Sequence, residues 1–369
     1  MKKCKYLGVL FLSILLLTAC SHYNVDTPLA KSDFVLIDKD SYYLCNLDEE
    51  TDEVIVSNIL KAPKNKKDLG YLNWFDFEDE NSYYLKTQTS KTRKTYLQTI
   101  SKDTLDINSI ELKNDYYSSY LYKGKLYAAS STFVNGNACI LMDVYNSDLS
   151  LEYSKNFEYE IAAMVPGGLV VDDEKIYMVC GAVGEGASYG ATKTYLFEFD
   201  LNFNFLSETD LQLNDAGYQS TVKIDNFLYL AKTSQGVDSQ GEGIGSAYID
   251  RYNLDKKEME FNFIKLDKQY PYRIKHDAVN NNLIVLHERW SAGNNYYSIY
   301  NLEDNSLDTV LLDNALYGDK FVFQGQSDDK YYFQTPQRLG VYDVKSKTIK
   351  EYDLTSLNLD LSNGIFFTE

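Results

Sequence analysis

The stretch from Tyr272 to Leu312, YRIKHDAVNNNLIVLHERWSAGNNYYSIYNLEDNSLDTVLL, decides the fold of this chain. It contains four runs rich in aromatic and β-branched residues, which favour strands, and turn residues separate these runs. The runs are Tyr272–Asp277, Leu283–His287, Tyr296–Asn301 and Leu307–Leu312. The asparagines before Leu283 tolerate the positive φ that a tight hairpin requires. The stretch therefore predicts a unit of consecutive antiparallel strands.

The end of the third run recurs along the chain as an aromatic or apolar residue followed by Asn, Asp or Ser. These junctions lie at Cys45-Asn46, Ile100-Ser101, Tyr145-Asn146, Phe199-Asp200, Tyr252-Asn253, Tyr300-Asn301 and Tyr342-Asp343. Their successive spacings are 55, 45, 54, 53, 48 and 42 residues. Periods of about 40–50 residues with several strands each are typical of propeller blades. No amphipathic helix pattern interrupts the series. The junctions predict an all-β, seven-bladed β-propeller of four-stranded blades.

The two ends of this region predict how the ring closes. Residues 33–60 supply strands at Phe34–Ile37, Tyr42–Asn46 and Val54–Ile59, and the C-terminus supplies a single strand at Gly364–Thr368. Pairing the C-terminal strand with the first strand completes a blade and leaves no unpaired sheet edge at the seam. We therefore expect residues 33–369 to form one propeller, and we expect it to be monomeric.

The repeat resembles the large group of seven-bladed propellers that includes the quinoprotein-dehydrogenase-like and YVTN-type repeats. The resemblance covers nearly all of residues 33–369, and it rests on the strand pattern. The chain lacks the Trp-Asp ending of WD40 repeats, a recurring kelch double glycine and the tryptophan docking motif of quinoproteins. The resemblance therefore implies the fold, and no family chemistry is carried over.

The N-terminus carries a separate pattern. Lysines at positions 2, 3 and 5 precede an apolar run from Tyr6 to Leu17, which leads into Leu17-Thr18-Ala19-Cys20. This pattern resembles the precursors of bacterial lipoproteins. The apolar run is shorter than the roughly 20 residues needed to span a bilayer. The resemblance implies a signal peptide at 1–19, lipidation of Cys20 and a tether at 20–32. It also implies an extracytoplasmic protein that touches the membrane only through its lipid anchor.

Composition narrows the choice of partners. The net charge is −18, and it becomes −21 once residues 1–19, with three lysines and no acidic residue, are removed. So acidic a chain repels nucleic acid, and we expect no nucleic-acid partner. The odd set of Cys45, Cys139 and Cys180, without CxxC spacing, argues against a disulfide framework or a zinc site. Buried free thiols are expected, with a Cys139–Cys180 bridge as the alternative.

The longest loops are expected on one face of the propeller, at Gly181–Lys193, Lys232–Ala247 and Glu288–Asn295. Long loops on a rigid scaffold commonly carry function. Aromatic residues at the starts of the inner strands could stack on a sugar or clamp a peptide, or they could simply pack between blades. The side chain of His287 and its loop neighbours should be exposed. The candidate ligand-binding residues are Trp74, Tyr116, Tyr189, Tyr218, Tyr272, His287, Arg289 and Trp290.

Catalytic and metal-binding signals are weak. Residues 186–190 (GASYG) fit the hydrolase pattern G-x-S-x-G, but that motif needs a helix after the serine, whereas Thr194–Asp200 predicts a strand. The chain has three histidines and no local set of metal ligands. We therefore predict no catalytic residue, no metal site and no cofactor. Acidic stretches at Asp48–Asp52 and Asp76–Asp79 could bind Ca²⁺ through their oxygens, although solvated turns are the commoner explanation.

Together these observations predict a non-catalytic lipoprotein that binds a peptide, glycan or protein partner through its long-loop face. The alternative is a metal-assisted hydrolase or lactonase with acidic ligands in the central funnel. A third option is an envelope-assembly scaffold similar to the lipoprotein propeller of outer-membrane biogenesis, which would require a cell with two membranes.

Overall fold

The computed structural model describes residues 32–38, 40–48, 50–61, 77–88, 94–161, 163–183, 193–211, 216–239, 243–288, 292–312, 322–327, 329–335, 337–359 and 364–367. The predicted lipidation pattern at Leu17–Cys20 lies outside the described residues, as do the rest of the predicted signal peptide and nearly all of the tether. Within the described part of the chain, no helix is long and apolar enough to cross a membrane.

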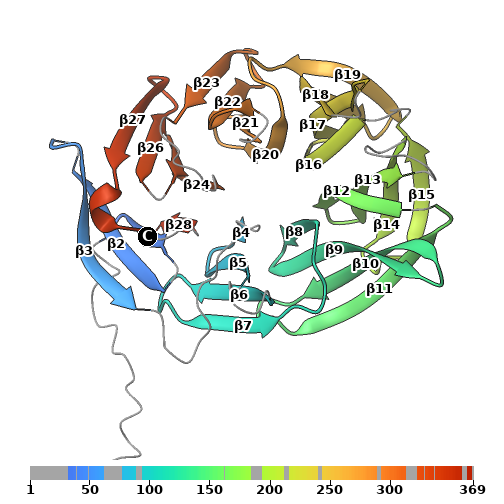
Figure 1. Ribbon diagram of the computed structural model, residues 1–369, viewed down its shortest axis with the longest axis horizontal. Coiled ribbons are helices and arrows are strands. Elements are labelled where there is room, and N and C mark those ends of the chain that lie inside the picture. Colours follow the sequence, from blue (N-terminus) through green and yellow to red (C-terminus); the bar gives the residue numbers. More distant parts are fainter. Residues whose placement is uncertain are drawn as a thin grey trace, which may run out of the picture.

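The described strands form seven four-stranded antiparallel sheets arranged in a ring (Figure 1). Blade 1 contains β28 (Gly364–Phe367), β1 (Phe34–Ile37), β2 (Ser41–Asp48) and β3 (Glu53–Lys61). Blade 2 contains β4 (Phe77–Glu78), β5 (Ser82–Gln88), β6 (Thr95–Ser101) and β7 (Ile107–Glu111). Blade 3 contains β8 (Ser118–Tyr122), β9 (Lys125–Val134), β10 (Asn137–Tyr145) and β11 (Leu151–Tyr159).

The other four blades follow in chain order. Blade 4 contains β12 (Ala163–Val171), β13 (Lys175–Val183), β14 (Lys193–Asp200) and β15 (Phe205–Asp210). Blade 5 contains β16 (Ala216–Ile224), β17 (Phe227–Val237), β18 (Gly243–Asn253) and β19 (Glu258–Lys265). Blade 6 contains β20 (Pro271–Asp277), β21 (Asn282–His287), β22 (Tyr296–Asn301) and β23 (Leu307–Leu311). Blade 7 contains β24 (Val322–Ser327), β25 (Lys330–Gln334), β26 (Arg338–Asp343) and β27 (Thr348–Asp353), and a 3₁₀ turn (Thr355–Leu357) follows it.

The predicted seven-bladed architecture is confirmed, and so is its closure. The C-terminal strand β28 pairs antiparallel with β1, with Phe34 opposite Phe367 and Ile37 opposite Gly364. The first blade is therefore built from both ends of the chain, and in Figure 1 the blue N-terminal strands lie beside the red C-terminal ones. This pairing gives β1 a neighbour along each of its edges.

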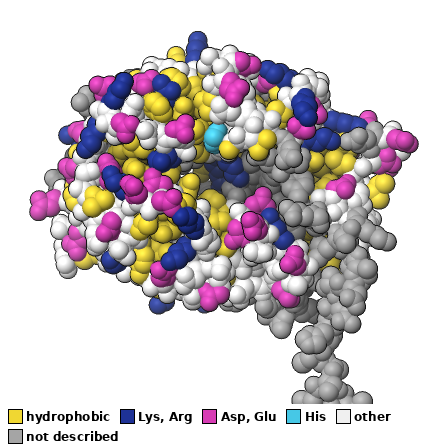
Figure 2. Space-filling view, turned by 180° about the vertical axis from the view of Figure 1, so that it is seen from behind, with side chains coloured by type: hydrophobic (Ala, Val, Ile, Leu, Met, Phe, Trp, Pro, Cys, Tyr) yellow, Lys and Arg dark blue, Asp and Glu magenta, His cyan; other side chains and the backbone are white. Residues whose placement is uncertain are grey.

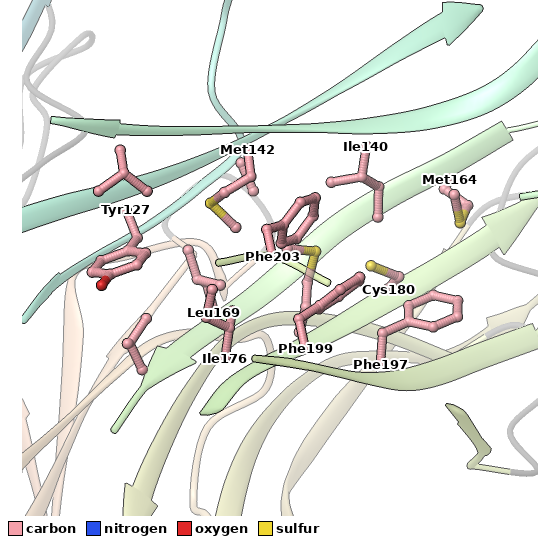
Figure 3. Close-up of a cluster of buried hydrophobic side chains, with 14 of the residues drawn as sticks. Tyr127, Ile140, Met142, Met164, Leu169, Ile176, Cys180, Phe197, Phe199 and Phe203 are labelled. Carbon is pink, nitrogen blue, oxygen red and sulfur yellow. The ribbon is translucent and has the colours of Figure 1, made fainter. Parts of the chain in front are cut away.

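The hydrophobic core lies between the blades. Among the described residues there are seven clusters of buried hydrophobic side chains, and each cluster joins two neighbouring blades. Figure 3 shows the cluster between blades 3 and 4, where Met142 and Ile140 of β10 face Phe197 and Phe199 of β14. A blade is therefore covered on both faces only when both of its neighbours are in place.

Strand β1 shows why the inner strands are apolar throughout. Successive side chains of a strand point to opposite faces. Accordingly, Phe34 and Leu36 pack against blade 7, whereas Val35 and Ile37 pack against blade 2. All four side chains are 0% exposed. Burial on both faces replaces the usual apolar–polar alternation with a continuous apolar run.

In blades 4 to 7 the polar residue of the junction has a structural role in the turn before the outer strand. Its side-chain oxygen accepts backbone N–H groups of that turn, which is an Asx turn. The acceptors include Asp200, Asn253, Asn301 and Asp343. In blade 1 this role belongs to Asp48, whose carboxylate accepts the N–H groups of Glu50 and Thr51. The junction predicted at Cys45-Asn46 is thus placed two residues early.

One predicted loop is largely sheet. Lys232–Ala247 was expected to be a long loop, but β17 extends to Val237 and β18 begins at Gly243. The ladder continues because bulges absorb the irregular register, with Ser234 opposite Gly245 and Val237 opposite Gly243. Gly245 is required there, because a Cβ atom at this position would lie 2.3 Å from the ring of Tyr270.

The three described cysteines are free thiols, as predicted, and they are buried. Burial raises the pKa of the Cys45 thiol to about 12, so that it stays protonated and unreactive at neutral pH. These cysteines therefore act as small apolar core residues.

We expect removal of residues 360–369 to lower the free energy of unfolding by several kcal/mol, because each ladder hydrogen bond that β1 loses contributes about 1 kcal/mol. The exposed edge of β1 should also promote aggregation. Thermal unfolding and size-exclusion chromatography would measure both effects. Removal of Thr368 and Glu369 alone, beyond the end of β28, is the control. If the chain without residues 360–369 were as stable as the full chain, the pairing of β28 with β1 would not hold the ring closed.

Candidate functional site

A cavity of about 690 Å³ lies among the inner strands of blades 2 to 6. Its walls come from β4, β5, β8, β12, β16 and β20 and from the residues directly before β8. Figure 2 shows a hollow at the centre of one face, with Lys and Arg side chains gathered inside it. Because inner strands of separate blades converge here, the lining combines residues that are far apart in the sequence.

Tyrosines form one part of the lining. Tyr117 is 60% exposed, and the backbone N–H of this residue donates to the carbonyl of Ala129 over 2.9 Å, which extends the ladder at the start of β8. Tyr272 near the start of β20 is half-buried and lines the same cavity, as do Tyr116 and Tyr120. Exposed aromatic rings offer a flat face for stacking together with a polar hydroxyl.

Charged side chains form the other part. The lining cations are Lys86, Lys223, Arg273 and Lys275, and the lining carboxylates are Glu78 and Asp115. His276, also in the lining, shares a 3.2 Å hydrogen bond between its Nε2 and the Oδ1 of Asn281. Lysine and arginine thus outnumber the acids among the described lining residues.

Lys86 is the most buried of these cations, at 4% exposed. Its ammonium donates to the carboxylate of Asp115 over 2.5 Å and to the carbonyl of Tyr116 over 2.8 Å. Burial lowers the pKa of Lys86, and the neighbouring Asp115 opposes that shift. The ion pair with Asp115 offsets part of the cost of burying the Lys86 ammonium.

Ion pairs also hold two other charges of the lining. Lys223 lies 3.2 Å from the carboxylate of Asp172. Glu78 lies 2.8 Å from the ammonium of Lys102. The first pair joins blade 5 to blade 4, whereas the second lies within blade 2.

Two of the predicted tyrosines are buried between blades. Tyr116 packs between blades 2 and 3, and its hydroxyl donates to Asp143, whereas Tyr218 packs between blades 4 and 5 and donates to Asp250 over 2.6 Å. Burial raises the pKa of both hydroxyls, and the carboxylates add to the shift. Tyr116 also lines the cavity, but Tyr218 does not. Of the two possibilities left open for the inner-strand aromatics, packing between blades holds for Tyr218.

His287 lies in the interior, in contrast to the exposed position that was expected. It ends β21 at 1% exposed, and its ring nitrogens lie 2.8 Å from the carbonyl of Gln269 and 2.8 Å from the hydroxyl of Ser298. Burial lowers its pKa from 6.5 to about 4, so the imidazole is neutral at pH 7. The sequence pattern placed His287 beside a loop, but the strand ladder continues to this residue and turns it inward.

Of the predicted ligand-binding residues that the structure describes, Tyr116 and Tyr272 line the cavity together, whereas Tyr218 and His287 do not. Trp74, Tyr189, Arg289 and Trp290 lie outside the described residues. The cavity cations were not predicted. A usable signal was the run Tyr272-Arg273-Ile274-Lys275-His276, because basic residues in an inner strand of an acidic chain need a polar environment.

Acidic residues in the described ranges do not form a metal-binding group, since no set of three or more His, Cys, Asp and Glu side chains converges there. Asp79, one of the acids considered for Ca²⁺, accepts the N–H groups of Asn81 and Ser82 and the hydroxyl of Tyr84. Its contacts are those of a solvated turn.

Comparison with known proteins bears on the fold. No family model matches the sequence, and no curated protein matches it. Among solved structures, the chain is similar to a periplasmic gluconolactonase of Pseudomonas aeruginosa, with a TM-score of 0.57 and 10% identity over 91% of this chain and 99% of that one. It is also similar to KlHsv2 with loop 6CD replaced by a Gly-Ser linker, with a TM-score of 0.48 and 8% identity over 88% and 94% of the two chains. The first similarity supports the propeller fold.

Replacing His287 by Gln should flatten the acid dependence of stability. In the wild type the folded pKa of about 4 lies below the ordinary 6.5, so the unfolded chain binds more protons between these values. Stability contributed by the neutral ring is present above pH 6.5 and falls as the pH drops towards 4, by about 3 kcal/mol in total. Urea unfolding at pH 7, 5.5 and 4 would measure this loss, which His287→Gln should lack.

Phe133→Ala, which removes an exposed ring and no titratable group, is the control and should retain the wild-type pH dependence. An identical slope for wild type and His287→Gln would contradict the assignment of this acid sensitivity to the buried ring.

Proposed function

We propose that this protein is a non-catalytic binding propeller that holds a glycan or peptide ligand in its central cavity. The same proposal places it outside the cell membrane, tethered through a lipidated Cys20, on the basis of the sequence pattern alone. A protein partner that presents a glycan or a peptide segment would be bound in the same cavity. Tyr189 and Trp290 of the long loops remain proposed contributors.

The cavity is the observation that supports binding best. Its volume of about 690 Å³ lies within the range of roughly 300–1,000 Å³ that small-ligand pockets occupy. Tyr117 is 60% exposed inside this cavity, although tyrosines at the starts of other inner strands, such as Tyr218, are packed away. A large ring that is held in place and still accessible can contribute contact area at low entropic cost.

The alternative of a metal-assisted lactonase requires acids that are available to ligate a metal in the funnel. The carboxylates that line the described cavity, Glu78 and Asp115, instead lie within 2.8 Å of lysine ammonium groups. The similarity to a gluconolactonase, at 10% identity, bears on the fold alone. These ion pairs favour binding over hydrolysis as the role of the described lining.

Replacing Tyr117 by Ala should weaken ligand capture about tenfold, equivalent to about 1.4 kcal/mol, because the stacking face is lost. Stability should change by less than about 0.5 kcal/mol, as is usual for exposed positions. The full chain, purified in detergent and immobilised, would be exposed to glycan and peptide fractions released from its own cell envelope. The retained fraction would then be identified and its affinity measured.

The matched control is Phe133→Ala. Phe133 is 61% exposed, close to the 60% of Tyr117, but it does not line the cavity. Equal retention by wild type, Tyr117→Ala and Phe133→Ala would contradict a binding role for the cavity. Lactone hydrolysis by the purified chain that is lost on chelation of divalent metals would replace the proposal with the enzymatic alternative.

A further inference from the structure

The two faces of the propeller differ in the connections that they carry. In blade 3, β8 starts at the same end as the turn between β9 and β10, whereas the turn between β10 and β11 lies at the opposite end. We call the first end the long-loop face, because the predicted long loops join second to third strands. We call the second end the turn face, because the Asx turns before the outer strands lie there. Since antiparallel neighbours alternate in direction, the inner strands of blades 2 to 7 run from the long-loop face to the turn face.

The cavity lining extends between these faces, and its accessible apolar groups lie near one of them. Tyr117 directly precedes β8, and Val165 is the third residue of β12, so both stand at the long-loop end of the cavity. Their side chains are 60% and 41% exposed. Lys223 and His276, next to the last residues of β16 and β20, stand at the turn end. The exposed ring of the proposed binding site is therefore approached from the long-loop face.

The described fold begins on the opposite face. Phe34 starts β1 opposite Cys45, near the end of β2 that leads into the turn before β3. The preceding residue, Asp33, is held at this place. Its backbone N–H donates to the carbonyl of Cys45 and to the Oδ1 of Asn46, each over 2.9 Å. Its carboxylate accepts the backbone N–H of Leu47 over 3.2 Å. The predicted tether therefore joins the propeller at a fixed point on the turn face.

The length of the tether limits how the propeller can face a membrane. Residues 20–31 separate the predicted lipid anchor from the described fold, and twelve residues span at most about 40 Å. To bring the long-loop face to the membrane, the tether would have to cover the height of a blade, which is about 30 Å for the 10 residues of β9. It would also have to pass β2 and β3, which lie outside β1 at about 4.8 Å per strand. This path takes nearly the whole reach. With the turn face towards the membrane the tether need not be stretched, so it keeps its conformational entropy.

We propose that the tether holds the propeller with its turn face towards the membrane, so that the long-loop face and the exposed ring of Tyr117 are directed away from it. This inference rests on the lipid anchor of the proposed function and adds the side from which the ligand comes. The long-loop face is the interaction surface, and the ligand enters from the side away from the membrane and is not embedded in the bilayer.

Energy transfer from the lipidated chain to labelled vesicles tests this orientation. Asn137→Cys at the start of β10 places a maleimide-linked dye on the long-loop face, and Ser147→Cys in the turn before β11 places it on the turn face of the same blade. Both positions are exposed, whereas the three described native cysteines are buried. Each variant, isolated from membranes in detergent, is inserted into preformed phosphatidylcholine vesicles that carry rhodamine on some headgroups. Because about the height of a blade separates the two positions, transfer should be at least about twofold more efficient from Ser147→Cys.

A longer tether is the control. An insert of about 20 Gly-Ser residues between Lys31 and Ser32 behaves as a flexible coil and should remove the difference. Thermal unfolding of each variant checks that it is folded, and Lys256→Cys in the turn before β19 is a second turn-face position.

Equal transfer from the two faces, or more efficient transfer from Asn137→Cys, overturns the inference and leaves the cavity and the anchor of the proposed function standing. A difference that persists with the long tether overturns the role of the tether in orienting the propeller. If mass spectrometry finds no lipid on the N-terminal peptide, the anchor and this inference fall together, whereas ligand capture by Tyr117→Ala still decides the binding role of the cavity.

Discussion

Closure of the ring is the constraint on which the rest of this structure depends. Each blade presents apolar side chains on both faces, and the described clusters lie between blades and not within a shared centre. No blade can therefore bury both faces until its two neighbours are in place. The short ladder between β28 and β1 supplies the last neighbour, and it joins segments from opposite ends of the chain. The cost of bringing the ends together rises only slowly with chain length, so a few ladder bonds and the clusters on either side of blade 1 can hold the ring shut.

Closure also creates the cavity. Inner strands from separate blades meet around one axis, and their side chains near that axis have no further blade to pack against. Charged residues are tolerated there because the cavity gives them water or a partner, as with Lys86 and Asp115. The same residues between two blades would face apolar surroundings. Ring geometry thus separates an apolar layer between blades from a polar lining at the centre.

This separation lets the described lining of the cavity carry another balance of charges than the outer surface. On the outside, acidic residues such as Asp48 and Asp343 accept backbone N–H groups of turns. Basic residues at the centre are few and are held by strands that cannot move independently. The ligand of the proposed function would therefore meet a prearranged set of charges and rings, which lowers the entropic cost of binding.

The sequence by itself determined the repeat, the number of blades and the closure. Local chemistry sets each of these: runs rich in aromatic and β-branched residues, Asx-forming residues such as Asn253 and Asn301 after the third strands, and strand patterns left over at both termini. Tertiary structure decided which side chains share the centre. Tyr117 is open to the cavity and Tyr218 is closed off between blades, although both stand near the start of inner strands. Tertiary contacts likewise bury the side chain of His287 and extend the hairpin at Lys232–Ala247 as sheet. Exposure depends on bulges, register and the neighbouring blade, and those contacts exist only once the ring has formed.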